Sequence, residues 1–148
     1  MSYTSLFYHL VFSTKQRVPW LTPERLTKCC RYMGGTVRNL KGTLLEANGA
    51  ADHVHLVTLV APVVSISEFL KQVKGGSSQW IHETFAELRD FWWQDGYAAF
   101  TVSKSALPDV LSYVRNQAEH HRNMSFEEEL IALLDRHGVE YDSRYVLG

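Results

Sequence analysis

Two histidines separated by one apolar residue, His53-Val54-His55, are the first group whose spacing could do chemistry. Residues i and i+2 of a β-strand point to the same face about 6.5 Å apart, so two imidazoles at this spacing can bind one metal ion. Asp52, just before them, lies at the end of a turn and can support the ligands. The alternative is a strand that carries two half-buried histidines on its polar face. The chain has neither the His-x-His-x-Asp-His run of metallo-hydrolases nor a H-E-x-x-H zincin motif.

A second group, Tyr113, Gln117 and His121, recurs every four residues and would share one face of a helix. An ordinary amphipathic helix would place apolar residues there, whereas this face offers a nucleophile and candidate ligands. The carbonyl oxygen of Gln117 suits a hard divalent ion that already has two imidazole ligands. His120 and His121 are rival third ligands, or partners that support the ligands. The alternative is that Tyr113 is a half-buried packing residue.

The net charge of −1 hides an uneven distribution of charge along the chain. Up to Gly42 there are seven Lys and Arg residues and one acid, Glu24, whereas from Asn123 onward there are six acids and two Arg residues. The basic N-terminal segment could form a phosphate-binding face, although two solvated helix faces of opposite charge fit the sequence equally well. Lys71 and Lys74 could hold phosphates of a nucleic-acid backbone, or simply form a basic helix end.

These chemical groups need a scaffold, and the apolar pattern predicts four strands and several helices. Strands are expected at residues 6–13, 43–48, 53–60 and 97–103, from β-branched and aromatic runs bounded by turn residues. Helices are expected at 22–40, from 65 to about 81, at 108–121 and at 126–136, from caps and helical spacing. The order is β-α-β-β-α-β followed by further helices, which predicts an α+β fold with a ferredoxin-like antiparallel sheet.

Length and composition limit the class of protein. The chain has 148 residues, 45% hydrophobic and 12% aromatic, which fits one folded domain spanning 1–148 rather than a disordered chain. Its longest uncharged apolar stretch, residues 56–66, is far shorter than the roughly 20 residues of a membrane span, and no secretory signal is evident. The adjacent Cys29 and Cys30 fit neither a structural disulfide nor a metal site. We therefore expect a soluble cytoplasmic protein with no membrane partner.

Taken together, these segments make the chain resemble the small single-tyrosine transposases of insertion sequences, the HUH-type group named for two histidines around one hydrophobic residue. The resemblance covers nearly the whole chain. It is carried by residues 8–15 (YHLVFSTK), 52–55 (DHVH), 65–75 (SISEFLKQVKG), 91–97 (FWWQDGY), 113–121 (YVRNQAEHH) and 125–129 (SFEEE). A lone His-x-His is a weak signal, but these segments in this order are specific.

The resemblance implies that Tyr113 is the nucleophile and that His53, His55 and Gln117 bind Mg²⁺ or Mn²⁺. Attack of Tyr113 on the scissile phosphate would displace a 3′-OH and leave a 5′-phosphotyrosine. Because one phosphodiester replaces another, cleavage and rejoining of single-stranded DNA would need no nucleoside triphosphate.

The family also recognises DNA hairpins near the ends of its elements and works as a dimer, in which the tyrosine helix can be donated to the partner's metal site. The resemblance therefore implies single-stranded DNA with hairpin ends as the partner. It also implies a homodimer, with the C-terminal helix and tail, residues 122–148, at the dimer interface. We place the hairpin-binding surface on six basic residues of the first two expected helices: Arg25, Lys28, Arg31, Arg38, Lys71 and Lys74.

Two other functions fit parts of the same pattern. A metal-dependent nuclease or phosphodiesterase could use His53 and His55 with water, rather than Tyr113, as the nucleophile. A non-catalytic module for single-stranded nucleic acid could use the ferredoxin-like fold, but RNA-binding domains of that kind carry aromatic residues where His53 and His55 stand here. A decayed copy that binds DNA without moving it is a third alternative, and the intact nucleophile and ligands argue against it.

Overall fold

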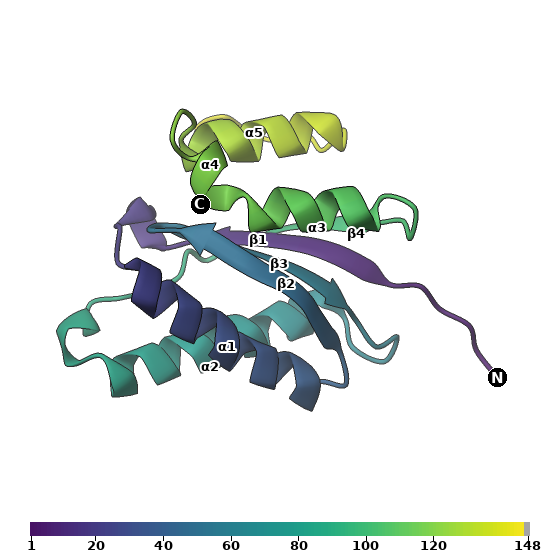
Figure 1. Ribbon diagram of the computed structural model, residues 1–148, viewed down its shortest axis with the longest axis horizontal. Helices are drawn as coiled ribbons and strands as arrows, with labels where there is room; N and C mark the ends of the chain where they lie inside the picture. The colour runs from purple at the N-terminus through teal and green to yellow at the C-terminus, as the bar shows by residue number, and fades with distance from the viewer. Residues whose placement is uncertain (147–148) are drawn as a thin grey trace.

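The computed structural model describes residues 1–146 and confirms the expected α+β fold. Four strands form one antiparallel sheet in the order β2-β3-β1-β4 (Figure 1). The strands are β1 (Phe7–Ser13), β2 (Thr43–Ala50), β3 (His53–Leu59) and β4 (Ala98–Val102). The helices are α1 (Pro23–Asn39), α2 (Ile66–Thr84), α3 (Leu107–Arg115), α4 (Gln117–His120) and α5 (Phe126–Arg136), with single 3-10 turns at Lys15–Arg17 and Ala86–Leu88.

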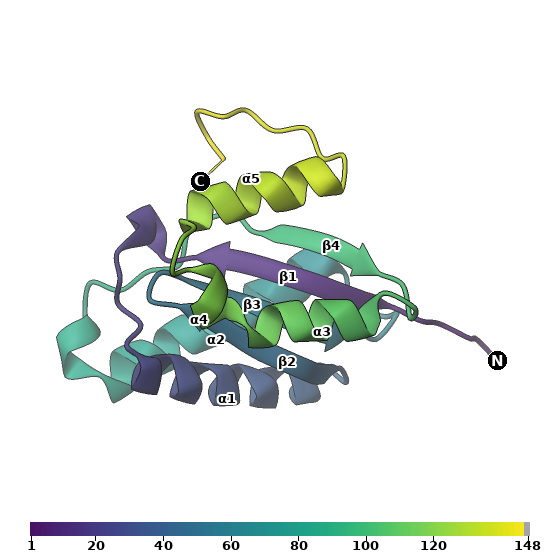
Figure 2. The same ribbon diagram turned by 45° about the horizontal axis from the view of Figure 1, so that its top comes forward.

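The sheet separates two helical layers. Helices α1 and α2 cover one face, and α3, α4 and α5 lie over the other (Figures 1 and 2). The core beneath α1 and α2 is built from fully buried side chains such as Phe12, Met33 and Phe69. Among residues 1–146 no helix is both long enough and apolar enough to cross a membrane.

The C-terminal helix α5 buries its apolar side on the chain's own sheet. Phe126, Leu130 and Leu134 form one cluster with Val11 of β1 and Phe100 of β4. The placement of residues 122–148 at a dimer interface stays a prediction, and residues 147 and 148 lie outside the described part of the chain.

Alternation along the central strands sends the chemical groups to the layer of α3, α4 and α5. Val54 and Leu56 of β3 enter the core beneath α1 and α2. Since a strand presents every second residue to one face, His53 and His55 point the other way. In the antiparallel register His9 of β1 is the diagonal neighbour of His55 on that same face.

Side-chain caps fix where three of the helices begin. Thr22 Oγ1 and Ser65 Oγ each accept a backbone amide from the first turn of α1 and α2. Ser125 and Glu128 form the predicted capping box of α5, with the Glu128 amide 3.2 Å from Ser125 Oγ. This cap holds the first turn of α5, which contains Glu129, over the sheet.

The continuous helix predicted at 108–121 is wrong, because the helix breaks at Asn116. In an unbroken helix the Arg115 carbonyl would accept the amide four residues ahead. Here the side chain of Asn48, in β2, donates to that carbonyl at 3.0 Å instead. Tyr113 therefore ends up in α3 and Gln117 in the short α4, rather than on one face of a single helix.

Gly49 allows β2 to approach β3 closely beside the two histidines. A Cβ at this position would lie 2.1 Å from the carbonyl oxygen of His53 and 2.9 Å from the Cα of Val54. Both contacts are with backbone, which cannot rotate away as a side chain can. A larger residue would therefore force the edge strand off the strand that carries His53 and His55.

We expect Gly49→Ala to destabilise the fold by about 3 kcal/mol, the upper end for overpacking, because the backbone of β3 must move. Gly75→Ala in α2 is the matched control, since a Cβ there meets nothing within 4 Å. That control should stabilise the fold by up to about 1 kcal/mol, because Ala favours a helix more than Gly does. Urea unfolding followed by tryptophan fluorescence measures both, and equal midpoints for Gly49→Ala and wild type would contradict the clash.

Candidate active site

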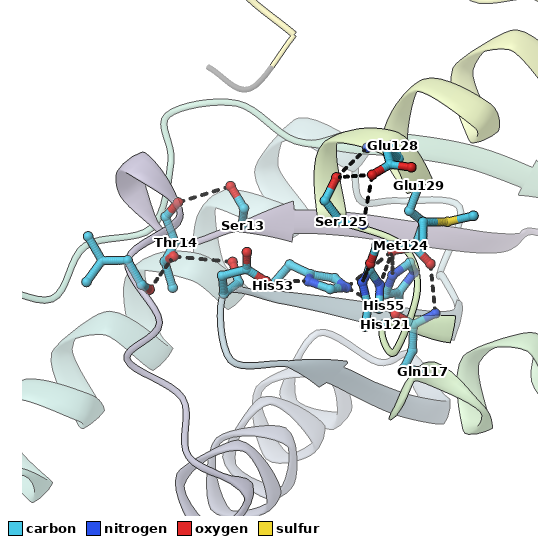
Figure 3. Close-up of polar contacts among 12 residues, drawn as sticks. Ser13, Thr14, His53, His55, Gln117, His121, Met124, Ser125, Glu128 and Glu129 are labelled. Atoms are coloured by element: carbon cyan, nitrogen blue, oxygen red, sulfur yellow. Dashed lines mark hydrogen bonds and ion pairs between the residues drawn. The ribbon is translucent and has the colours of Figure 1, made fainter. Parts of the chain in front are cut away.

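The two histidines of the predicted motif lie side by side on the sheet face covered by α4 and α5. Both side chains are fully buried. Asp52 ends the turn between β2 and β3, and its Oδ1 accepts a hydrogen bond from His53 Nδ1 at 2.8 Å. This bond orients the imidazole, so that its Nε2 faces Gln117 and the helical layer (Figure 3).

The carboxylate of Glu129, in the first turn of α5, lies between the histidines and closes the site (Figure 3). Glu129 is only 1% exposed. Its Oε1 accepts hydrogen bonds from His55 Nε2 at 3.0 Å and His121 Nε2 at 2.9 Å, and it lies 3.2 Å from His53 Nε2. A buried carboxylate needs such partners, because an unpaired charge in the interior is costly.

The second oxygen of Glu129 faces the segment that carries the predicted nucleophile. The Tyr113 hydroxyl and the Gln117 amide Nε2 both donate to Oε2, the latter at 2.9 Å. The carbonyl oxygen of Gln117 accepts a hydrogen bond from His53 Nε2 at 3.0 Å. One chain thus brings the predicted nucleophile and the three predicted ligands, His55 included, around a single carboxylate.

His9 extends the network on the far side of His55. Its Nε2 lies 2.8 Å from His55 Nδ1. Because His55 Nε2 donates to a carboxylate, its Nδ1 accepts and His9 Nε2 donates. Burial, followed by the neighbouring His55, lowers the pKa of His9 to about 3, and burial lowers the pKa of His55 to about 4. Both rings are therefore neutral at pH 7.

His53 differs from these two rings because it has two acidic partners. Burial alone would lower its pKa, but hydrogen bonds with Asp52 and Glu129 outweigh burial and raise the pKa to about 9. Burial would likewise favour a protonated Glu129, yet hydrogen bonds from His121, His53 and His55 hold the pKa of this carboxyl far below its usual range. In the metal-free protein a charged His53 therefore lies against a charged Glu129.

Tyr113 is held as a neutral phenol. Burial and then the Glu129 carboxylate raise the pKa of Tyr113 above its ordinary value of 10. His120 stacks on the phenol ring, with 4.5 Å between centroids and 28° between planes, and its Nε2 has no hydrogen-bond partner among the described residues. The two rival histidines thus have different positions: His121 reaches Glu129, whereas His120 covers the ring of Tyr113.

The site has a donor set that fits a divalent metal ion. One ligand atom from each of His53, His55 and Glu129 lies within 4.8 Å of the other two. Imidazole nitrogens with a carboxylate suit first-row divalent metals, and the Gln117 carbonyl adds a neutral oxygen on the same side. This cluster is compatible with a divalent metal site, and Glu129 adds a carboxylate to the ligands expected from sequence.

Two residues of the site, Glu129 and His9, were not predicted as site residues from the sequence. Glu129 ends a run of three acids, which made it look like part of a solvated face. It nevertheless stands within the apolar stripe of α5, between the buried Phe126 and Leu130, and a charge at such a position is a usable signal. His9 likewise stands within an apolar strand, between Tyr8 and Leu10 of β1.

The six basic residues expected to bind DNA lie in α1 and α2, on the sheet face opposite Tyr113 (Figure 1). Arg31, Arg38 and Lys71 are exposed. Arg25 and Lys28 are each paired with an acid, at 2.7 and 2.9 Å respectively. The structure therefore keeps these residues apart from the tyrosine and the histidines.

Lys74 has a structural task that its sequence context did not reveal. Its Nζ donates to the backbone carbonyls of Gln94 at 2.6 Å and Gly96 at 2.7 Å. These two bonds tie α2 to the loop that leads into β4. The ammonium group is thus already occupied by two neutral acceptors.

Comparison with known proteins shows the family. The sequence model of the family described as "Transposase IS200 like" matches residues 2–117. The transposase for insertion sequence element IS200 of Salmonella typhimurium is 32% identical over 125 residues, which cover 78% of each chain. Glu129 lies beyond the part of the chain that the family model matches.

Solved structures share the fold. The crystal structure of a candidate transposase from Deinococcus radiodurans has a TM-score of 0.66 and 25% identity, covering 79% of this chain and 95% of the other. A REP-associated tyrosine transposase bound to a REP hairpin has a TM-score of 0.61 and 12% identity, covering 82% of this chain and 74% of the other. Fold and sequence together define a DNA-processing enzyme of mobile elements. The chain belongs to the IS200-like transposase family, which confirms the resemblance seen in its sequence.

We expect Glu129→Gln to lower the pKa of His53 from about 9 in the metal-free protein, because the variant loses a buried negative charge beside the imidazole. The raised pKa stabilises the folded state below the ordinary value of 6.5, and this contribution is lost as pH rises through about 9. The unfolding free energy of the variant should therefore fall less over that interval.

Proton NMR titration of the histidine rings in EDTA measures the pKa of His53 directly. Glu127→Gln, an exposed position of the same helix, is the matched control and should leave the titration unchanged. A His53 pKa that is the same in Glu129→Gln and wild type would show that the carboxylate does not hold the charged imidazole.

Proposed function

We propose that this transposase cleaves and rejoins single-stranded DNA through a covalent bond between Tyr113 and a 5′-phosphate. The observation that carries the proposal is the position of the phenol. Its hydroxyl donates to Glu129, the same carboxylate that lies against His53 and His55. A phosphate bound at this cluster would therefore lie next to the attacking oxygen.

In the proposed step Tyr113 Oη attacks the scissile phosphorus, the bond from phosphorus to O3′ breaks, and the departing O3′ takes up a proton. The phenol proton is released to solvent as the bond to phosphorus forms, and Glu129 Oε2, which accepts the hydrogen bond from that hydroxyl, orients the attacking oxygen. One phosphodiester bond is exchanged for another, so the reverse attack by a 3′-OH rejoins the strand and restores the tyrosine.

We further propose that His53, His55, Gln117 and Glu129 hold Mg²⁺ or Mn²⁺. When bound there, the ion supplies positive charge that offsets the charge developing on the phosphate oxygens. Glu129 can contact both the ion and the nucleophile, because Oε1 faces the imidazole nitrogens and Oε2 faces the phenol. Asp52 acts as a positioning residue, since it orients His53 through Nδ1.

The proposed substrate is single-stranded DNA with a hairpin near the end of the element. The support is the solved REP-associated transposase, which shares the fold and is bound to a REP hairpin. On this chain the exposed cations Arg31, Arg38 and Lys71 remain candidates for the phosphates of the stem. A homodimer remains part of the proposal, although Tyr113 already lies at the histidines of its own chain.

The test uses a labelled single-stranded oligonucleotide with the hairpin and flank found beside this gene, incubated with the protein and Mg²⁺ or Mn²⁺. We expect a slower, protease-sensitive band on a denaturing gel, because the protein stays bonded to the DNA. Tyr113→Phe should abolish the band, since the ring remains but the attacking oxygen is gone. EDTA should abolish it too.

Other outcomes separate the alternatives. Cleavage without the band, retained in Tyr113→Phe, would show a metal-dependent nuclease that uses water. Binding without cleavage or a band would show a non-catalytic DNA-binding module.

Metal binding tests the role of Glu129 as a ligand independently of DNA. We expect Glu129→Gln to weaken Mn²⁺ binding at least about tenfold, because the variant replaces an anionic ligand with a neutral one. Electron paramagnetic resonance of Mn²⁺ titrated into the protein measures the affinity, with Glu127→Gln as control. Equal affinity of Glu129→Gln and wild type would remove Glu129 from the ligand set.

A further inference from the structure

A cavity of about 620 Å³ lies beside Tyr113, between β4, α3 and the end of α5. Figure 2 shows α3 and α5 on the same side of the sheet, and β4 is an edge strand of that sheet. The volume falls within the range of about 300–1,000 Å³ that small organic ligands occupy. Tyr113 and His9 both contribute to the lining, so the cavity borders the site already described.

The walls of the cavity combine apolar surface with positive charge. Val102, Val110 and Leu133 supply apolar lining, and Asp109 adds one carboxylate. Arg136 lines the cavity and makes no ion pair with an acid among residues 1–146. Its guanidinium is close enough to act electrostatically on the Tyr113 phenol. An apolar surface beside an unpaired cation suits a base and a sugar followed by a phosphate.

His137 adds a flat polar edge to the same cavity. Its ring stacks on Phe100, with 4.2 Å between centroids and 21° between planes, so it is held in one orientation. Its Nδ1 donates to the Leu133 carbonyl at 2.8 Å, which leaves Nε2 for another partner. A fixed imidazole edge can form a hydrogen bond with a base.

The geometry of phosphoryl transfer decides which nucleotide can use this cavity. The attacking and leaving oxygens stand roughly in line, so the nucleotide that leaves through O3′ departs on the side opposite Tyr113. The nucleotide bonded through O5′ lies to the side of that line and stays attached to the tyrosine. His120 covers one face of the phenol ring, and Glu129 accepts the hydrogen bond from its hydroxyl. The cavity that borders Tyr113 offers space for the attached nucleotide.

We propose that this cavity binds the nucleotide on the 3′ side of the scissile phosphate, with its base against Val102 and Val110 and its next phosphate near Arg136. The inference rests on the proposed function, because it takes Tyr113 as the nucleophile. It assigns to the end of α5 a role in holding the covalent intermediate, in addition to the role of Glu129 at its start.

The test measures equilibrium binding of the fluorescent hairpin oligonucleotide in EDTA, where cleavage is absent. An abasic site on the 3′ side of the cleavage position should weaken binding to wild type about tenfold, the order expected for loss of one seated base. An abasic site on the 5′ side should have little effect. Arg136→Gln should weaken binding of every oligonucleotide, whereas Arg144→Gln, which lies outside the cavity lining, should not.

A matched pair of bulky substitutions locates the effect. Ala106→Trp fills the cavity from an exposed position, and Ala132→Trp adds the same bulk at an exposed position of α5 outside the cavity lining. In Ala106→Trp the intact and 3′-abasic oligonucleotides should bind equally, because the base is already excluded. In Ala132→Trp the tenfold difference should remain.

An unchanged difference in Ala106→Trp, or equal effects of abasic sites on both sides, would overturn the assignment of the cavity. The proposed function is judged separately by the covalent band of wild type with the intact oligonucleotide. A band without position-dependent binding would leave Tyr113 as the nucleophile and remove only the nucleotide site. Absence of the band, with position-dependent binding retained, would remove Tyr113 as the nucleophile and leave the cavity as a nucleotide site.

Discussion

A carboxylate withdrawn from water must find its partners inside the protein, and much of this structure is arranged around that requirement at Glu129. The two oxygens are satisfied by side chains from β3, α3, α4 and the residue that follows α4. The strand β3 is far in sequence from the segment of α3 and α4, and side chains of both meet at Glu129 because α5 lies across the sheet. The candidate active site therefore depends on the apolar packing of the C-terminal helix, and the partners of Glu129 offset the cost of burying its charge there.

Much of the scaffold could be predicted, because it depends on local patterns. The strand period places His53 and His55 on one face, and the Ser125 cap marks the start of α5. Glu129 could not be placed in the same way, since its burial depends on how α5 packs on a sheet that ends many residues earlier. The shared helical face expected for Tyr113 and Gln117 is wrong, because the helix breaks between them, yet both side chains still reach Glu129 Oε2.

The basic residues show a similar limit of local reasoning. Lys71 and Lys74 look alike in the sequence, being one helical turn apart in a polar segment. In the structure Lys71 is exposed, whereas Lys74 holds two carbonyls of a loop about twenty residues further on. Because the partners of a lysine are often distant in sequence, charge alone cannot distinguish a DNA contact from a brace between two elements.

The bond from Asn48 to the Arg115 carbonyl has a consequence for how the enzyme can change over time. Asn48 stands in β2 and pairs with His55 in β3, so one hairpin carries both histidines and also anchors the end of the helix that carries Tyr113. The hairpin thus fixes the distance between Tyr113 and the two histidines. Loss or gain of one residue within the hairpin would turn the histidines to the other face of the sheet. It would also break the hydrogen bond between Asn48 and the Arg115 carbonyl. The exposed positions of α3, by contrast, can be substituted without altering the distance between Tyr113 and the histidines.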